Sequence, residues 1–520
     1  MAFDTELSAL ISERLPHLLA LGEPYHGEPA FARLRNRILE TLAGHGFRSI
    51  VIESDRAAAL AVDDYVQGRR DDLDLSTGIS HDWGSRPPTR ELIDWLRVHN
   101  ADRSDAERIT FHGFDAPTEI QAAPSPVRYL RELAGYLGVA VVLDDDEDRW
   151  TAPEIMYDAT RSPGRSPEAL ALRGLAEDLQ TRLYADAPHL IQQSSAPAWY
   201  RAQVLATTAI GLLSYHAAMA DPGTQSERVG RLLSTRDAIM ARNLLDIRTH
   251  ERDRGPTMVF AHNAHLQRPS SSWETHWEGV DMAAEWSGAG SIVSALLGER
   301  YVFIAGSLGA SGLAGLDEPE PGTYENRLGP STGVFPPPPA DGLHDRETEV
   351  LGHFPLTGSL AGTSDAILHI GHRPGAADAA RIAGMPGVTE TWIATGSDMP
   401  SYTWEDRFFF AGADRMRPFA TIVLHDVPDF DERSQLSGPG RYRVNVEVGR
   451  AQFKTLFGYG PEEFATHQEK IDFAVVDTLM PHPAYAVQGW ASVVCPGPST
   501  AAELDRLLEH ARVRSLARQR

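Results

Sequence analysis

The stretch HLLALGEPYHGEPAFARLRNRILETLAGHGFRSIVIESD, residues 17–55, decides the fold class of this chain. Its outer parts, residues 17–21 and 48–53, are short apolar runs of the kind that form buried strands. Residues 30–43 between them carry apolar side chains at helical spacing, namely Phe31, Leu34, Ile38 and Leu42. A strand, a helix and a second strand in this order predict a parallel sheet that is covered by helices.

The same alternation continues along the chain, where further apolar runs predict strands at residues 109–114, 257–261, 301–306 and 366–372. Residues 126–253 differ, because Ala- and Leu-rich runs give them a mostly helical pattern. Residues 329–341 are rich in Pro and Gly and are expected to form a connector. We therefore predict an α/β domain over residues 1–375, with a mostly parallel sheet, helices on both faces and a large helical insertion at about 126–253.

Residues 380–520 show a different pattern. Short β-type runs, such as FFFAG at residues 408–412 and YRVNVEV at 442–448, are separated by turn signals and by helical segments. This pattern is typical of an α+β domain rather than of strand–helix alternation. We therefore predict a separate accessory α+β domain at residues 380–520, and the pattern indicates no function for it.

The composition indicates which binding partners are disfavoured and in which cellular compartment the protein is expected. The 520 residues include 72 Asp and Glu against 48 Lys and Arg, which gives a formal charge of -24. Such a chain repels nucleic acid and anionic membranes, and it has no apolar run of about 18 residues that would span a bilayer. Cys495 is the single cysteine, so the chain forms no internal disulfide and no cysteine-based zinc site. Because the N-terminus also lacks the pattern of a signal peptide, we expect a cytoplasmic protein.

Three of the predicted strands end in residues that carry acid–base chemistry. They are Glu23 and His26 in LGEPYHG, Glu53 in SIVIESD, and His262 and His265 in MVFAHNAH. Ligands bind at the carboxyl ends of parallel strands, so these ends predict one catalytic site. His26 is the candidate general base, because an imidazole titrates near neutral pH. Glu23 either orients His26 or acts as the base itself.

Further residues are candidates for binding substrate. Asp115 ends the third strand along the chain. Arg35 lies on the helix after LGEPYHG, where it either holds an anionic or carbonyl oxygen or forms a surface salt bridge. Asn263 lies between the two histidines and is placed to donate a hydrogen bond to an oxyanion. An isolated pair such as His262 and His265 fits a metal site, a catalytic site or neither.

The chain lacks the usual signatures of a covalent nucleophile. It contains no G-x-S-x-G elbow and no phosphate-binding G-x-x-x-x-G-K-[ST] loop, and Cys495 lies far along the chain among prolines. If the site is hydrolytic, the attacking species is therefore an activated water. We expect no cofactor and no metal ligands, although metal dependence stays open.

Several segments of the first domain, taken in order, resemble the erythromycin esterase family over about residues 18–307. They are GEPYHG with the helix FARLRNRILETL, IVIESD, WLRVHN, HGFDAP, RDAIMARNL and MVFAHNAH. The resemblance implies an α/β core with a helical insertion and hydrolysis of an ester, in the best-known members the macrolactone of a macrolide, with antibiotic resistance as the outcome. It also implies that His26 activates water with help from Glu23. The other residues that would line the site are Arg35, Glu53, His262 and His265.

Two segments depart from the family pattern. Leu266, Gln267 and Arg268 follow the second histidine, where members often continue with Gly-Asp, and DWGSRPP at residues 82–88 keeps only part of an aromatic-rich pattern. These loops shape the substrate pocket, so the resemblance carries over a small-molecule ester or lactone but not the macrolide itself. Two alternatives remain, a metal- or haem-binding protein on the same fold and a biosynthetic enzyme that acts on an ester or lactone metabolite. The sequence does not indicate the oligomeric state.

The C-terminal domain resembles a small uncharacterised bacterial domain family over about residues 380–498. The segments that carry this resemblance are FFFAGADRMRPFATIV, GRYRVNVEVG and DTLMPHPAYAVQGW. No activity comes with it. His482 lies between two prolines, where it either shares a pocket with Asp477 and Trp490 or forms a structural turn, and the turn is the favoured interpretation.

Overall fold

The computed structural model describes residues 2–519 except for short gaps. The gaps are residues 119–122, 145, 157, 278–279, 312–314, 330–331, 372–374, 394–398, 401–402, 414 and 437–440. The chain divides into two compact units. The first comprises Met1–Ser307, Gly322–Tyr324 and Gly333–His369, and the second comprises Leu308–Pro321, Glu325–Thr332 and Ile370–Arg520.

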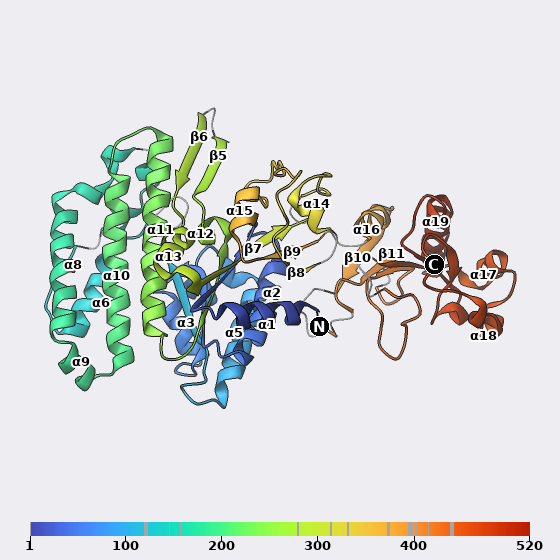
Figure 1. The fold of residues 1–520 in the computed structure, drawn as a ribbon, viewed down its shortest axis with the longest axis horizontal. Helices are drawn as coiled ribbons and strands as arrows, with labels where there is room; N and C mark the ends of the chain where they lie inside the picture. Colours follow the sequence, from blue (N-terminus) through green and yellow to red (C-terminus); the bar gives the residue numbers. More distant parts are fainter. Residues whose placement is uncertain are drawn as a thin grey trace. The chain divides into compact units, whose positions relative to one another are not determined.

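A seven-stranded sheet organises the first unit (Figure 1). In pairing order its strands are β3 (Thr110–Asp115), β2 (Ser49–Asp55), β4 (Thr257–His262), β1 (Leu18–Glu23), β7 (Tyr301–Leu308), β9 (Ala366–Ile370) and β8 (Gly333–Phe335). Neighbouring strands from β3 to β7 run parallel, whereas β8 pairs with β9 in the antiparallel direction. The prediction of a mostly parallel sheet is therefore confirmed.

In the described part of the connector predicted at residues 329–341, the one regular element is the edge strand β8. It follows the short helix α14 (Tyr324–Leu328), and its buried Val334 pairs with Leu368 of β9. Three residues between proline-rich segments are too few to show a period of two, so this strand leaves no pattern in the sequence.

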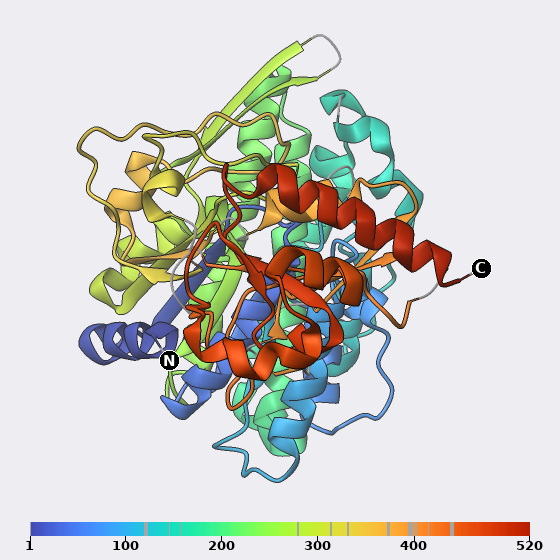
Figure 2. The ribbon, with the colours of Figure 1, turned by 90° about the vertical axis from the view of Figure 1, so that its right-hand side faces the viewer.

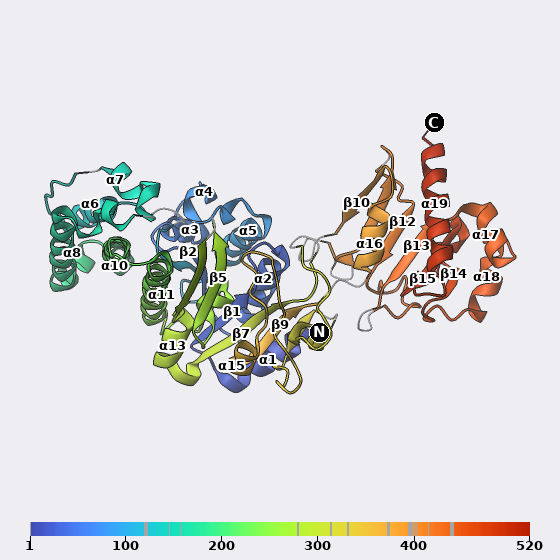
Figure 3. The ribbon, with the colours of Figure 1, turned by 90° about the horizontal axis from the view of Figure 1, so that it is seen from above.

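Helices cover both faces of this sheet, because β1, β2, β4 and β7 are buried along their whole length. Figure 3 shows α2 (Pro29–Gly44) and α5 (Pro87–Ala101) on one side, and α11 (Gln225–His250) and α13 (Ala289–Leu297) on the other. The apolar stripe predicted on α2 is buried, and Glu28 caps this helix by accepting the Ala30 N–H. The remaining elements of this unit include α1 (Ala2–Arg14), α3 (Ala59–Val66), α4 (Leu75–Gly78), α12 (Asn263–Leu266), α15 (Gly358–Thr363) and the ribbon of β5 (Ser271–Trp277) and β6 (Val280–Trp286).

The predicted helical insertion is present (Figure 1). It has a hydrophobic core of its own. Its helices are α6 (Val127–Leu137), α7 (Glu147–Thr151), α8 (Pro167–Ala185), α9 (Ala187–Gln193), α10 (Ala196–Met219) and α11. Leu133, Leu172 and Leu212 are among the buried residues that these helices share. α11 also packs on β3 and α13, so this helix brings its side chains to the sheet. Among the described helices, none combines the length and apolar character needed to cross a membrane.

The second unit contains a six-stranded antiparallel sheet. In pairing order its strands are β10 (Val388–Trp392), β11 (Arg407–Ala411), β12 (Ala420–Val423), β13 (Arg443–Glu447), β15 (Trp490–Val494) and β14 (Leu479–Pro481). α16 (Ala376–Ala383) and α19 (Ala501–Ala517), the long red helix in Figure 2, share a core with the strand residues Phe409, Ile422 and Val444. Two further helices are α17 (Gly449–Phe457) and α18 (Phe464–His467). This is the α+β architecture that the sequence predicts.

Candidate active site

The central strands of the first sheet end side by side in polar residues. Because β2, β4 and β1 are parallel neighbours, their carboxyl ends lie at one edge of the sheet, where ligands bind in such folds. Glu53 lies near the end of β2, His262 ends β4 and Glu23 ends β1. We call the group gathered at this edge the strand-end cluster; its members are Glu23, His26, Glu53, Asp115, Arg236, Asp237, His262 and His265.

Glu23 and His26 form a hydrogen-bonded pair in the turn after β1. His26 Nδ1 lies 2.8 Å from Glu23 Oε1, so its N–H donates to the carboxylate and Nε2 carries the lone pair. Glu23 is buried, whereas the His26 side chain is 33% exposed. The Trp83 ring lies 4.7 Å from the imidazole, centroid to centroid. The pair thus holds a basic nitrogen in one tautomer at a solvent-accessible position.

Glu53 is the acceptor on which the cluster converges. Its Oε2 accepts the backbone N–H of His262 at 2.9 Å, and its Oε1 lies 3.1 Å from Arg236 Nη2 and 3.3 Å from His265 Nε2. His26 Nε2 lies 3.9 Å from the same Oε1. Burial would raise the pKa of Glu53, but the charges of His265 and Arg236 hold that pKa well below its usual range. Glu53 is therefore a fixed negative charge beside His26.

His265 is held as a cation. Its Nδ1 lies 2.9 Å from Asp237 Oδ1, and its Nε2 faces Glu53. Burial would lower its pKa, but the two carboxylates raise the pKa of His265 to about 10. The ring is therefore charged at neutral pH and lies between two acceptors.

His262 is held as a neutral ring, only three residues away. Its Nδ1 accepts the N–H of Ala264 at 3.2 Å, and its Nε2 donates to the carbonyl oxygen of Pro24 at 3.1 Å. Burial lowers the pKa of His262 to about 3. With both ring nitrogens bonded to the backbone, His262 fixes the turn that carries His26.

Arg236 of α11 links Asp115 to the cluster. Its Nε lies 3.0 Å from Asp115 Oδ1, while its Nη2 reaches Glu53. Burial would lower the pKa of Arg236, but the two carboxylates raise it above its ordinary value. The same pairing lowers the pKa of Asp115, which burial alone would raise. His81 Nε2 lies 3.5 Å from the second oxygen of Asp115 and adds a partly exposed imidazole to this side of the cluster.

The candidate residues chosen from the sequence do not include Arg236, Asp237 or His81. Arg236 and Asp237 open the segment RDAIMARNL, so their one signal is the family resemblance of that segment. Asp237 also accepts the indole N–H of Trp286 and the backbone N–H of Ala289, both at 2.8 Å. It therefore anchors α13 as well as His265.

Arg35 lies apart from the hydrogen bonds of the cluster. It is 3% exposed, its Nε donates to Asn36 Oδ1 at 3.0 Å, and its Nη2 donates to the carbonyl oxygen of Pro88 at 3.3 Å. The guanidinium lies 5.0 Å from the centre of the Phe260 ring, and burial lowers the pKa of Arg35 to about 10. The structure thus buries this residue between α2, α5 and β4, where the charge of Glu23 partly offsets the effect of burial.

Asn263 belongs to the framework beneath the cluster. Its Nδ2 donates to the carbonyl oxygen of Gly306 at 2.8 Å, and its Oδ1 accepts the N–H of Gly306 at 3.0 Å. A Cβ at Gly22 would lie 2.1 Å from this Oδ1, so only a glycine fits there. The amide therefore ties the end of β4 to β7 and is engaged by the backbone.

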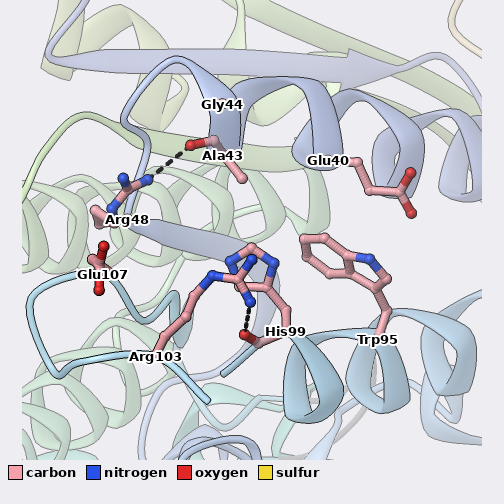
Figure 4. A pocket seen from close by; sticks show the side chains of 8 residues that line it. All are labelled: Glu40, Ala43, Gly44, Arg48, Trp95, His99, Arg103 and Glu107. Atoms are coloured by element: carbon pink, nitrogen blue, oxygen red, sulfur yellow. Dashed lines mark hydrogen bonds between the residues drawn. The ribbon is translucent and has the colours of Figure 1, made fainter. Parts of the chain in front are cut away.

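Two observations concern metal sites and pockets in the first unit. Within the described ranges, no group of three or more His, Cys, Asp and Glu side chains is arranged around a metal ion. A pocket of about 420 Å³ is lined by Arg48, which directly precedes β2, and by Trp95 and His99 of α5 (Figure 4). It lies where β2 begins, whereas the strand-end cluster lies where the strands end.

Comparison with known proteins matches a family model to each part of the chain. The model of the erythromycin esterase family matches residues 42–368, more than half of the chain. This match begins after Glu23 and His26. The model of a family of unknown function, DUF6194, matches residues 377–520. None of the curated proteins matches this chain.

Three solved structures resemble much of the chain. A mutant of the erythromycin esterase EreC in its open conformation is 16% identical, with a TM-score of 0.50 over 70% of this chain and 93% of that one. A Bacillus cereus protein is 18% identical, with a TM-score of 0.49 over 71% of this chain and 92% of its own. A succinoglycan biosynthesis protein is 15% identical, with a TM-score of 0.49 over 71% of this chain and 90% of its own. The similarity to EreC shows that the fold is shared.

Proposed function

The chain belongs to the erythromycin esterase family, and on this premise we propose that it hydrolyses a carboxylic ester or a lactone with His26 as the base that activates water. One observation carries the proposal. The Glu23 carboxylate binds Nδ1 of His26 at 2.8 Å, which leaves Nε2 as a base on a side chain that is 33% exposed. The buried charges around this nitrogen are paired with one another, so His26 is the group left to exchange a proton.

In this mechanism His26 Nε2 takes a proton from water, and the resulting hydroxide attacks the carbonyl carbon of the ester. Glu23 stabilises the imidazolium through the Nδ1–H bond, and Glu53, 3.9 Å from Nε2, adds a second negative charge that favours it. The imidazolium then returns the proton to the leaving alkoxide as the carbon–oxygen bond breaks. A carboxylic acid and an alcohol result, joined in one opened chain when the substrate is a lactone.

We assign polarisation of the substrate carbonyl to Arg236. Its side chain is 18% exposed against 8% for His265, so Arg236 is the more accessible of these two fixed cations. A guanidinium offers charged N–H donors that stabilise the negative charge developing on the carbonyl oxygen. Asp115 and Glu53 hold this guanidinium in place.

The proposal extends to substrate and setting. Macrolides are one substrate class to test, with inactivation of the antibiotic as the result, and simpler lactones are another. The mechanism uses protein side chains and water alone, so we propose that it needs no cofactor. The single Cys495 fits a reducing cytoplasm, and the acidic composition fits a small-molecule substrate rather than nucleic acid or a membrane surface.

A mass-spectrometric screen of macrolides and simpler lactones tests this proposal. The full chain is expected to convert at least one compound into a product heavier by one water, and His26→Ala is expected to leave that compound intact. A panel left unchanged by the wild type, or converted equally by the variant, would contradict it.

The metal- or haem-binding alternative has a separate test. Metal analysis of protein purified without a histidine tag is expected to show no stoichiometric metal, and hydrolysis is expected to survive treatment with a chelator. A bound metal or haem that is lost in His26→Ala would favour the alternative instead.

A further inference from the structure

A second pocket lies in the C-terminal unit, on the sheet face opposite α16 and α19. Alternate strand residues face opposite sides of a sheet, and Phe409, Ile422 and Val444 pack in the core with these helices. Their chain neighbours therefore face the other side, where they line a pocket of about 330 Å³. We call it the sheet-face pocket; the lining residues that matter here are Asp406, His425, Asp431, Arg443, His482 and Trp490.

Arg443 forms the charged floor of this pocket and is 2% exposed. Nη2 lies 2.6 Å from Asp431 Oδ2, and Nη1 lies 3.2 Å from Asp431 Oδ1 and 2.6 Å from Ser434 Oγ. Nε donates to Asn445 Oδ1 at 2.8 Å. These bonds use four of the five N–H groups of a guanidinium. The remaining N–H is on Nη2, which lies 3.4 Å from His482 Nε2.

His482 is not able to accept that N–H. The backbone N–H groups of Ala484 and Tyr485 both donate to its Nδ1, at 3.0 and 3.1 Å, so Nδ1 carries the lone pair. Burial and the charge of Arg443 hold the pKa of His482 well below its ordinary value, so the ring is neutral and its one proton is on Nε2. Among the described residues neither of these two donors has an acceptor, and their side chains are only 2% and 3% exposed.

His482 thus has both of the roles considered for it in the sequence. It closes a turn through Nδ1, and it lines a pocket together with Trp490. Asp477 does not line this pocket, because its carboxylate accepts the N–H groups of Gly497 and Thr500 at 2.8 and 3.1 Å. That carboxylate instead holds the turn at residues 497–500, which directly precedes α19.

Further polar groups surround the two donors. His425 Nδ1 is buried and has no hydrogen-bond partner among the described residues. Asp406 accepts the N–H of Leu424 at 3.0 Å, and burial raises the pKa of Asp406 to about 7. Four aromatic side chains line the walls together with aliphatic and polar residues; the aromatic ones are Phe408, Phe430, Tyr485 and Trp490. A buried polar group costs free energy unless it is bonded, so two donors without an acceptor in the described part of this unit favour a ligand that supplies one.

We propose that the sheet-face pocket binds an uncharged, flat small molecule through a carbonyl oxygen that accepts hydrogen bonds from Arg443 Nη2 and His482 Nε2. The ligand is uncharged because Asp431 already neutralises Arg443, so an anion would meet no unbalanced positive charge. It is flat because aromatic side chains form the walls. The volume lies within the range of small-molecule sites. Aromatic amides and heterocycles with a ring carbonyl belong to this class.

Ligand-observed NMR on the full chain tests the proposal with three probes that share one ring. Benzamide offers a neutral carbonyl, benzoate an anion, and toluene no polar group. We expect saturable binding of benzamide and at least tenfold weaker binding of benzoate and toluene. No binding of benzamide, or equal binding of all three probes, would overturn the proposal.

Matched variants locate the binding. His482→Asn keeps an acceptor for the two backbone N–H groups but removes the Nε2 donor, and Trp490→Ala removes a wall. Each is expected to weaken benzamide binding at least tenfold without lowering the melting temperature of the C-terminal unit. His26→Ala is expected to bind benzamide as the wild type does, which separates this site from ester hydrolysis. If His482→Asn does not fold, benzamide binding to Trp490→Ala tests the site alone. Unchanged binding of benzamide to that variant would overturn the proposal.

Discussion

The strand-end cluster and the sheet-face pocket each bury an arginine, an aspartate and a histidine in one network, yet His265 of the cluster is charged whereas His482 of the pocket is neutral. In the cluster, His265 lies between two carboxylates, which raise its pKa to about 10. In the pocket, the carboxylate of Asp431 is committed to Arg443, so the charged neighbour of His482 is a guanidinium and its pKa is well below the ordinary value. The charge of the nearest groups therefore sets the protonation state of each imidazole. Carboxylates beside the ring favour the charged form, and a guanidinium beside the ring favours the neutral form.

This difference matches the two functions that we propose, proton transfer in the strand-end cluster and ligand recognition in the sheet-face pocket. The charges of the cluster are fixed by one another, and His26 Nε2, the base that we propose, lies beside Glu53. In the pocket, the Nε2–H of His482 and an N–H of Arg443 face one another and are available to a ligand. The first arrangement favours a reaction at one atom, and the second favours binding of an acceptor.

The largest expected effect is on catalysis at His26. Once a substrate is known, His26→Ala should lower kcat about 1,000-fold, because a positioned base contributes roughly 10²–10⁴-fold. The melting temperature should change little, since this side chain is partly exposed. His26→Asn is the matched control, because its amide still donates to Glu23 but offers no base. Wild-type turnover in His26→Asn would show that His26 only positions other groups.

The second largest effect is a loss of stability when the strand-end cluster loses one negative charge. Glu53→Gln removes the carboxylate shared by Arg236 and His265, and the free energy of unfolding should fall by about 4 kcal/mol, as for a buried ion pair that loses one partner. Hydrogen-exchange mass spectrometry reads the two units separately and should place the loss in the first. Asp431→Asn is the counterpart and should weaken only the second unit. A Glu53→Gln protein as stable as the wild type would show that the cluster does not need this charge.

The third prediction concerns the pH dependence of stability, which distinguishes charged His265 from neutral His482. The folded-state pKa of His265 is raised from 6.5 to about 10, so its contribution to stability is complete below pH 6.5 and is lost as the pH rises through 10. His265→Gln should therefore be less stable than the wild type by about 3 kcal/mol at pH 6, and the difference should shrink towards pH 10. Chemical denaturation at several pH values measures it. A difference that does not depend on pH would mean that His265 is neutral in the folded protein.

The sequence predicts those features that depend on neighbours along the chain. Apolar runs and helical spacing locate the strands and α2, and the rule for strand ends brings Glu23, Glu53 and His262 to one edge. Arg236 could not be predicted in this way, because it lies 121 and 183 residues from its partners Asp115 and Glu53 in the sequence. Arg35 is closer to His26 in sequence but is buried against Pro88. Tertiary contacts of this kind leave no periodic signal.

The charge states of the histidines are even harder to predict from the sequence. AHNAH shows two equivalent histidines, and only the approach of Asp237 from α11 makes His265 a cation while His262 stays neutral. The tautomer of His482 likewise depends on two backbone N–H groups of its own turn and on an arginine from another strand. Such states follow from the number and type of close partners in space, which one sequence does not give.

The smallest expected effect concerns Asp406 in the sheet-face pocket. Burial raises its folded-state pKa from 3.8 to about 7, so its contribution to stability is present below pH 3.8 and is lost as the pH rises through 7. Asp406→Asn keeps an oxygen for the Leu424 N–H and removes the charge, so the second unit should gain about 2 kcal/mol at pH 8 and nothing near pH 4. Asp431→Asn, by contrast, should destabilise this unit at both values because it leaves Arg443 unpaired. Hydrogen exchange at the two pH values distinguishes these signs. If Asp406→Asn also destabilised the unit at pH 8, the Asp406 carboxylate would be needed as a charge, and the pocket would suit a cationic group rather than a neutral carbonyl.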